Sequence, residues 1–571
     1  MNLPYSTVDP SASPGQLGSR RLPPISILAL AVTLVTVWLY WPCVRNSFTY
    51  WDDDLYLREV EQHPRLTWST LKWAFTATQP FYYHPLTWVS LVLDYQLWGR
   101  NPAGNHATSL LLHAANAGLV VVLVWNLLTA VPTLSSSERR ALATLVGLLF
   151  AVHPMQVEPV AWYAERKTVL CATFALASLC AYVRYAQNTG RRLWWWTALG
   201  CSVAAMLAKP MAVSLPVVML VIDFYPMRRH LALGWRRLVM EKLPWLALSV
   251  VLSVVTFVAQ TRGGAVMEFE KLGLGARLLV AVRAVIFYLW KLVWPAWLLA
   301  YYPLGGKITL AHAEFWVPSA AFAVVTLLVV WYRRRAPAVV AAWIAYLAWL
   351  LPVSGLFQSG AQAAADRFAY LATLSILMLA AGGGLWLWRR MSSVGRLALT
   401  ALVAGELVFL GVRCRQQIAM WRNEETLWIE VLMHFPGSGM ANLHYAAELA
   451  AQQRFAEALP HAEIATEVFP DTEPSHSTLG LVWLKLGQPA QAVKELQEAI
   501  RWGPKLAAPR YNLACAYARL GQFAEAYDTL RQLARVDPQM LAFAARDTEF
   551  AALRADPQYG EPLRRLVSSS Q

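Results

Sequence analysis

Three consecutive carboxylates, Asp52, Asp53 and Asp54, stand shortly after the first apolar run of the chain, in the sequence FTYWDDDLY. Carboxylates held this close repel one another, and the repulsion raises the pKa of at least one of them. Such a group could act as a general base or bind a cation. A solvated acidic turn is the simpler alternative. The aromatic neighbours, Trp51 among them, suit both a membrane interface and stacking on a sugar ring.

A further acidic residue, Glu158, stands at the end of an apolar run, in the sequence HPMQVEPVAW that extends from His153 to Trp162. A carboxylate at membrane depth is costly and by default marks a functional site. Arg166 and Lys167 follow it in the chain, so an ion pair with one of them is the alternative. We expect a functional role for Glu158.

Two cations lie at the edges of later apolar runs. Arg367 follows Asp366 in the sequence ADRFAYL, and Lys209 stands between two apolar runs in AKP. The planar guanidinium of an arginine suits a phosphate group. A local ion pair with Asp366, or an anchor at the membrane interface, is the alternative. His84, in HPLTW, is expected to be structural unless it faces Asp52.

The elements that must carry these residues are helices that cross a membrane. Hydrophobic residues make up 57% of the chain and charged residues only 15%. Apolar runs of about 20 residues, the length that spans a bilayer, recur between residues 27 and 412. Arginine clusters such as Arg139-Arg140 separate these runs, as in loops that face the cytoplasm. The net charge of +14 therefore belongs to the membrane part, and we do not expect nucleic acid as a partner.

We predict an all-α protein, a polytopic bundle of about eleven spans with a repeat domain at its C-terminal end. An odd number of spans puts the C-terminal domain opposite a cytoplasmic N-terminus, and a twelfth span would move it inside. The expected parts are a disordered polar cytoplasmic tail (1–22), a transmembrane domain (23–415), a connector helix (416–439), three repeats (440–538), and a capping helix and tail (539–571).

Three segments of the transmembrane domain are expected outside. The first is the loop 44–104, in which the stretch from Trp68 to Phe75 predicts a helix that lies on the membrane. The second is the turn 153–167. The third is a re-entrant or outer segment over 261–314, although residues 277–299 are apolar enough to span.

The C-terminal part contains an internal repeat of 34 residues. Pro470, Pro504 and Pro538 are separated by this interval, and it recurs between Gly487 and Gly521. A 34-residue period with these residue types is typical of tetratricopeptide (TPR) repeats, in which each unit is a helix–turn–helix. Such repeats stack into concave surfaces that bind peptides, and a purely structural platform is equally compatible with the pattern.

Taken together and in this order, the motifs resemble a known family over almost the whole chain. The chain resembles bacterial TPR-containing relatives of the transmembrane and TPR repeat-containing protein O-mannosyltransferases, in the GT-C superfamily. Each motif alone is weak, and the set is fairly specific. The motifs are YWDDD (50–54), HPLTW (84–88), HPMQVEPVAW (153–162), ERK (165–167), AKP (208–210) and ADRFAYL (365–371).

The resemblance implies a GT-C-like glycosyltransferase that uses a sugar linked to polyprenyl phosphate. A protein hydroxyl is the favoured acceptor, on the periplasmic side of a bacterial inner membrane, and the TPR domain would lie on that side and could hold the acceptor protein or peptide. Lipid and polysaccharide acceptors stay open. No cofactor is predicted, and a divalent metal is left open.

The resemblance also implies roles for single residues. An acid of the first outer loop would be the catalytic base, either Asp52 or Asp53, because Trp51 directly before the acidic run departs from the usual pattern and leaves the choice open. Glu158 would assist. The other expected residues bind the donor phosphate (Arg367, Lys209 and Arg166) or line the substrate pocket (His84, Trp51, His153 and Trp162).

Two other functions fit the same sequence less well. A non-catalytic membrane anchor could present the TPR domain as a scaffold for envelope assembly. A transporter is the third hypothesis, but its binding residues would be expected near the middle of the bilayer rather than at the outer ends of spans.

Overall fold

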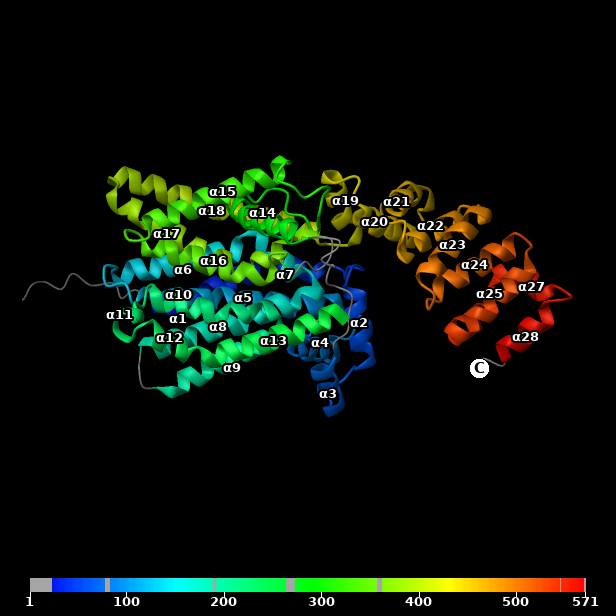
Figure 1. Cartoon of the computed structure of the whole chain (residues 1–571), viewed down its shortest axis with the longest axis horizontal. Coiled ribbons are helices and arrows are strands. Elements are labelled where there is room, and N and C mark those ends of the chain that lie inside the picture. The colour runs from blue at the N-terminus through cyan, green and yellow to red at the C-terminus, as the bar shows by residue number, and fades with distance from the viewer. Residues whose placement is uncertain are drawn as a thin grey trace, which may run out of the picture.

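A computed structural model describes residues 23–77, 83–187, 191–262, 273–356, 362–544 and 546–568. The predicted cytoplasmic tail 1–22 lies outside the described residues. The protein consists of a helical bundle and a chain of helix pairs that extends from one end of that bundle (Figure 1). An all-α fold with a C-terminal TPR domain is thereby confirmed.

The first half of the bundle builds its core. Its helices are α1 (Ile25–Tyr40), η1 (Trp41–Arg45), α2 (Asp53–Gln62), α3 (Trp68–Thr76), α4 (Pro85–Trp98), α5 (Pro102–Leu128), α6 (Ser136–Val152), η2 (Pro154–Gln156), α7 (Glu158–Ala161), η3 (Tyr163–Glu165), α8 (Arg166–Gln187) and α9 (Arg192–Ala208). Helix α5 packs against α1, α6 and α8, and α8 also packs against α9.

The second half of the bundle surrounds this core and closes it. Its elements are η4 (Pro210–Ser214), α10 (Leu215–Phe224), α11 (Arg229–Leu233), α12 (Trp235–Glu241), α13 (Leu243–Arg262), α14 (Leu274–Val293), β1 (Tyr302–Pro303), α15 (Ala313–Tyr332), α16 (Pro337–Leu350), η5 (Leu351–Val353), β2 (Gln362–Ala364), η6 (Asp366–Ala369), α17 (Thr373–Arg390) and α18 (Ser393–Met420). The two short strands pair antiparallel, with Tyr302 opposite Ala364.

The chain is a multi-pass membrane protein. Within the described residues, six helices are long and apolar enough to cross a membrane, and a seventh is added if the bent pair of α6 with η2 and α7 is one span. Several other predicted spans are shorter, as α10 and α16 are, so the number of spans is approximate. Helix α14 occupies much of the stretch predicted to be re-entrant, which stays a prediction.

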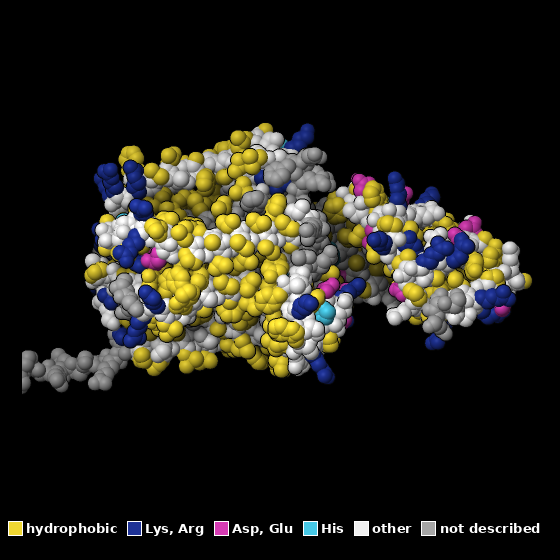
Figure 2. Space-filling view, turned by 60° about the horizontal axis from the view of Figure 1, so that its bottom comes forward, with side chains coloured by type: hydrophobic (Ala, Val, Ile, Leu, Met, Phe, Trp, Pro, Cys, Tyr) yellow, Lys and Arg dark blue, Asp and Glu magenta, His cyan; other side chains and the backbone are white. Residues whose placement is uncertain are grey.

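The side chains on the bundle surface fit a membrane setting. Hydrophobic side chains cover the flank of the bundle, and Lys and Arg gather at the end away from the repeat domain (Figure 2). At that end, Arg389 of α17 forms an ion pair of 2.7 Å with Glu138 of α6. The predicted interfacial helix is α3, on which Trp68 is strongly exposed.

The repeat domain follows a connector helix, α19 (Glu424–His434). Its helices are α20 (Gly439–Ala451), α21 (Phe455–Val468), α22 (Glu473–Lys485), α23 (Pro489–Trp502), α24 (Ala508–Arg519), α25 (Phe523–Val536), α26 (Pro538–Ala544), η7 (Thr548–Phe550), α27 (Ala551–Ala555) and α28 (Gly560–Ser568). Gly487 and Gly521 adopt left-handed backbone between paired helices, as the repeat pattern requires. Gln453 adopts the same conformation in the first repeat, with a φ of 63° and without glycine's freedom.

Candidate functional site

A cavity of about 510 Å³ lies between α8, η4, α13, η5 and the segment that contains β2. One part of its wall is polar and carries Glu165, Lys167, Lys209 and Arg367. The other part is apolar and includes Val254 and further residues of α13, a helix whose other side chains are widely exposed on the bundle surface. The cavity therefore joins a charged cluster to a helix with the surface of a lipid-facing span.

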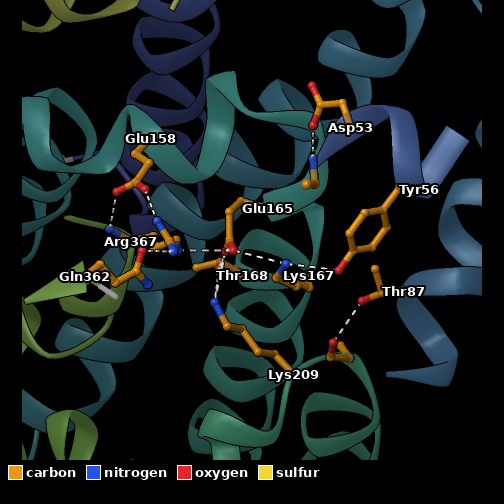
Figure 3. A network of polar contacts seen from close by, with 12 residues as sticks. Asp53, Tyr56, Thr87, Glu158, Glu165, Lys167, Thr168, Lys209, Gln362 and Arg367 are labelled. Atoms are coloured by element: carbon orange, nitrogen blue, oxygen red, sulfur yellow. Dashed lines mark hydrogen bonds and ion pairs between the residues drawn. The ribbon is translucent and has the colours of Figure 1, made fainter. Parts of the chain in front are cut away.

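Glu165 is the centre of the charged cluster (Figure 3). Its carboxylate lies 2.9 Å from Nζ of Lys209, 3.2 Å from Nζ of Lys167 and 3.3 Å from Nε of Arg367. The hydroxyl of Thr168 donates a further hydrogen bond to it. A single buried carboxylate thus holds three cations at one wall of the cavity.

Glu158 holds Arg367 from the other side. Its Oε2 accepts the backbone N–H of Arg367 at 2.8 Å, and its Oε1 pairs with the guanidinium. Gln362, on β2, accepts a hydrogen bond of 3.3 Å from the same guanidinium. The ring of Trp162 lies beneath that group, 5.0 Å from Cζ of Arg367. The sequence left open a pair between Glu158 and Arg166 or Lys167, and the structure forms a different pair.

Local breaks in the helices place Glu158 and Arg367. The chain bends by 61° between α6 and the η2–α7 segment, which turns Glu158 into the bundle. Pro159 occupies the first turn of α7, where its missing N–H costs nothing. On the other side, the β1–β2 pairing fixes the backbone shortly before Arg367, and Asp366 accepts a hydrogen bond of 3.1 Å from the hydroxyl of Tyr302.

The two candidate bases occupy different environments. Asp53 is buried and accepts hydrogen bonds from the N–H of Ala164 (2.9 Å) and from the N–H (2.9 Å) and hydroxyl (3.2 Å) of Thr49. Burial raises the pKa of Asp53 to about 7. This carboxylate ties the first loop to η3, directly beside Glu165.

Asp52 is half-buried at the start of α2, which its side chain does not cap. Within the part of the chain that the structure describes, its carboxylate accepts no hydrogen bond. Burial raises the pKa of Asp52, against the attraction of Lys167 and Arg367. Asp52 is thus the acid of the loop whose oxygens are available to a substrate.

The remaining predicted residues divide into two groups. Trp51 stacks on Trp162, with ring centroids 4.6 Å apart and planes 15° apart, and Trp162 in turn adjoins Arg367. His84 lines the cavity and stacks on Tyr56 and Trp88. Burial lowers the pKa of His84 well below its ordinary value, so the ring is neutral at physiological pH.

Arg166 and His153 lie apart from this cavity. The guanidinium of Arg166 pairs with Asp94 of α4 at 2.7 Å, and it donates a bond of 2.6 Å to the carbonyl of Asn105. Successive helical residues project about 100° apart, so Arg166 points away from the side that carries Glu165. Nε2 of His153 lies 3.1 Å from the carbonyl of Leu292.

Sequence reasoning did not single out Glu165, Lys167 and Gln362 as site residues. Glu165 and Lys167 enter a long apolar helix with their charges buried, which is the signal that identified Glu158. Gln362 stands outside any charged motif, and only the pairing of β2 reveals its position. In the described ranges no cluster of His, Cys, Asp and Glu has the arrangement of a metal site.

A repeat family and two human proteins are similar to this chain. A family model described as tetratricopeptide repeat matches residues 484–556. The human protein O-mannosyl-transferase TMTC4 is 25% identical over 418 residues, which are 64% of this chain and 54% of that protein. The human protein O-mannosyl-transferase TMTC1 is 22% identical over 70% of this chain and 49% of that protein. The chain thus spans about half the length of these human relatives.

Two further matches are shorter or weaker. Protein O-mannosyl-transferase Tmtc3 of Drosophila melanogaster is 29% identical over 25% of this chain and 17% of that protein. The crystal structure of ArnT from Cupriavidus metallidurans in the apo state aligns with a TM-score of 0.35 and 15% identity, over 84% of this chain and 79% of that chain. A TM-score of this size is too low to establish a common fold. The similarity to the protein O-mannosyl-transferases, over about two thirds of this chain, and the TPR match confirm the resemblance that the motifs indicated.

Proposed function

We propose that the protein transfers a sugar from a polyprenyl-phosphate donor to a protein hydroxyl on the periplasmic side of a bacterial inner membrane. The cavity carries this proposal, because it joins a cluster of three cations to an apolar wall on an exposed span. The names of the relatives make mannose the first sugar to test and a protein the first acceptor.

Charge in the cluster supports an anionic ligand. Arg367, Lys167 and Lys209 supply three positive charges, and Glu158 and Glu165 supply two negative ones. The positive charge at this wall exceeds the negative charge of the two glutamates that pair with it, and this excess attracts an anionic group. A sugar phosphodiester carries one negative charge, and an isoprenoid chain suits the apolar wall along α13.

The proposed transfer inverts the anomeric centre. The acceptor hydroxyl gives its proton to Asp52 while its oxygen bonds to the anomeric carbon, and the bond from that carbon to the phosphate oxygen breaks. The leaving polyprenyl phosphate gains a second negative charge, which Arg367, Lys167 and Lys209 stabilise. Glu158, Glu165 and Asp53 act as positioning residues that hold the cations and the loop.

The test is the release of polyprenyl phosphate from polyprenyl-phosphate mannose by the purified protein. We expect Asp52→Asn to lower turnover by about 10²–10⁴-fold, since that is the usual contribution of a general base. The matched control is Asp54→Asn, two residues away, whose carboxylate pairs outward with Arg58 at 2.6 Å. That variant should keep its turnover.

Three outcomes would contradict the proposal. Unchanged turnover in Asp52→Asn would remove Asp52 as the base, and a far larger loss in Asp53→Asn would transfer that role to Asp53. No release by the wild-type protein would favour the alternative function, a non-catalytic scaffold, which would tolerate substitutions at Asp52, Asp53 and Glu158.

A further inference from the structure

A carboxylate of the connector helix holds the loop that contains Asp52. Glu424, at the first turn of α19, is buried. Its Oε2 accepts the backbone N–H of Tyr50 at 2.8 Å, and its Oε1 accepts the indole N–H of Trp428 at 2.6 Å. Because Tyr50 precedes Asp52 by two residues, the connector fixes the backbone from which Asp52 projects.

The first helix of the repeat domain reaches the same loop. His444 of α20 stacks on Trp428, with ring centroids 4.7 Å apart and planes 11° apart. Trp51 meets both rings edge-on, at 5.2 Å from Trp428 and 6.5 Å from His444. Nδ1 of His444 lies 3.5 Å from Glu424, and 20% of the His444 side chain is exposed. The first repeat is thus part of the surroundings of Asp52.

Asp52 lies between the cavity and the repeat domain. Trp51, the residue directly before Asp52, stacks on Trp162 beside Arg367 on one side and meets Trp428 and His444 on the other. In the proposed transfer the phosphate lies at the cavity cations, and an inverting displacement brings the nucleophile from the opposite face of the sugar ring. The acceptor must therefore approach Asp52 from the side of His444.

We propose that α20 forms the acceptor wall of the transfer site, and that its occupant is a polypeptide segment presenting a Ser or Thr hydroxyl to Asp52. This inference rests on the proposed function and adds a location and a residue, His444, to it. The exposed ring of Tyr50 lies at the same junction, since the Tyr50 N–H is bonded to Glu424.

The direction of the repeat domain favours a polypeptide over a lipid. Helices α20 to α25 lead away from the end of the bundle rather than along its flank (Figure 1). Hydrophobic side chains, which a lipid acceptor would follow, cover that flank instead (Figure 2). TPR repeats stack into concave surfaces that bind extended peptides, so a peptide bound there would pass α20 before it reaches Asp52.

The test separates transfer to water from transfer to a peptide. Release of polyprenyl phosphate without an acceptor measures cleavage of the donor by the cavity residues and Asp52. Glycosylation of a synthetic Ser- and Thr-containing peptide measures binding of the acceptor at α20. We expect His444→Ala to raise the KM for the peptide by about tenfold, equivalent to one lost contact, while release to water stays within about twofold. The control is Phe543→Ala, an exposed aromatic of α26, which should change neither activity.

A second measurement does not depend on a variant. A peptide with a photoreactive benzophenone next to its Ser should crosslink to the wild-type chain within Gly439–Ala451. An unchanged peptide KM in His444→Ala together with crosslinks outside α20 would contradict the proposal that α20 binds the acceptor. Transfer to a lipid instead of the peptide would also contradict it. Wild-type protein that releases no polyprenyl phosphate would instead overturn the proposed function from which the wall is inferred.

Discussion

Glu165 is one buried carboxylate that three cations share. Without it, Arg367, Lys167 and Lys209 would face one another at a poorly hydrated wall with only Glu158 to offset them. Removal of one partner from a buried ion cluster is more costly than the cluster is worth, because the remaining charges lose their partner and recover no water. Glu165 therefore keeps the cationic wall of the cavity assembled.

We expect Glu165→Gln to lower the free energy of unfolding by about 3–5 kcal/mol, the cost of breaking a buried ion pair. Farnesyl phosphate should raise the Tm of this variant more than that of the wild type, because its phosphate replaces the missing charge. Thermal unfolding in detergent measures both effects.

Glu241→Gln is the matched control, since Glu241 pairs with Arg229 and Lys242 in a separate buried cluster. It should lose stability without a gain from farnesyl phosphate. Equal gains in both variants would contradict a phosphate site at Glu165.

As the pH is lowered, the transfer rate should begin to fall at a higher pH than the ordinary pKa of an aspartate would predict. Asp52 must be ionised to accept a proton, and burial raises the pKa of Asp52 above its ordinary value. The transfer rate is therefore lost as the pH falls through this raised pKa, above about 3.9. The pH profile of kcat/KM measures it, and an acid limb at or below that value would exclude Asp52 as the base.

Asp53 needs a separate control, because burial raises the pKa of Asp53 to about 7. The acid limb should keep its position in Asp53→Asn if Asp52 is the base. A limb that disappears in this variant would assign the titration to Asp53.

The sequence identified which charges matter better than it identified their partners. Glu158, Arg367 and Lys209 stood out because charge in an apolar run is costly, and the structure places all three in one cluster. The pairing of Glu158 with Arg367 joins positions 209 residues apart, and only tertiary packing decides it. The same limit explains Arg166, which the sequence grouped with the phosphate ligands and which pairs with Asp94 instead.

At the scale of elements, α13 decides what the cavity can hold. Val254 of this helix both lines the cavity and is exposed, so we expect its side chain to lie where a lipid chain would leave the cavity. We expect Val254→Trp to narrow that exit and to raise the KM for long-chain donors by about tenfold, with little change for a donor of two isoprene units. A KM series over donor chain length measures this effect.

Val251→Trp is the matched control for α13. Val251 is equally exposed and does not line the cavity, so its substitution should leave the series unchanged. Equal effects of both variants would show that α13 does not bound the donor chain.

Elements with a strong local pattern were the easiest to predict. The repeat helices follow a 34-residue period whose glycines need left-handed backbone, and the structure has that backbone at Gly487 and Gly521. The spans were harder, because hydropathy does not separate a short buried helix such as α10 from one that crosses the bilayer. The η2–α7 break depends on contacts with η6 and α5 and had no counterpart in the apolar pattern.

At the scale of the molecule, the two ends of the bundle differ in chemistry. The first loop and the repeat domain meet at one end through the bond from Tyr50 to Glu424. Lys and Arg gather at the other end (Figure 2), where the last turn of α17 carries Arg389 and Arg390. Arginine-rich loops remain in the cytoplasm. We therefore expect Tyr50 and the repeat domain to face the periplasm together.

Single cysteines test this orientation with a membrane-impermeant maleimide. Tyr50→Cys and Lys505→Cys should be labelled once the outer membrane is permeabilised, and Arg334→Cys only after the inner membrane is opened as well. Five of the six natural cysteines are buried, which keeps the background low. Labelling of Lys505→Cys without Tyr50→Cys would contradict a shared side.

The contact between His444 and Trp428 has a consequence for chimaeras of this protein. A graft that replaces the chain from Gly439 onward would discard His444 and bare the indoles of Trp51 and Trp428 to water. A graft that begins after Ala451 keeps the contacts of His444 with these two rings and exchanges only the repeat helices that follow α20. The interchangeable module is therefore shorter than the repeat array, because the first helix of that array has to be kept with the membrane domain.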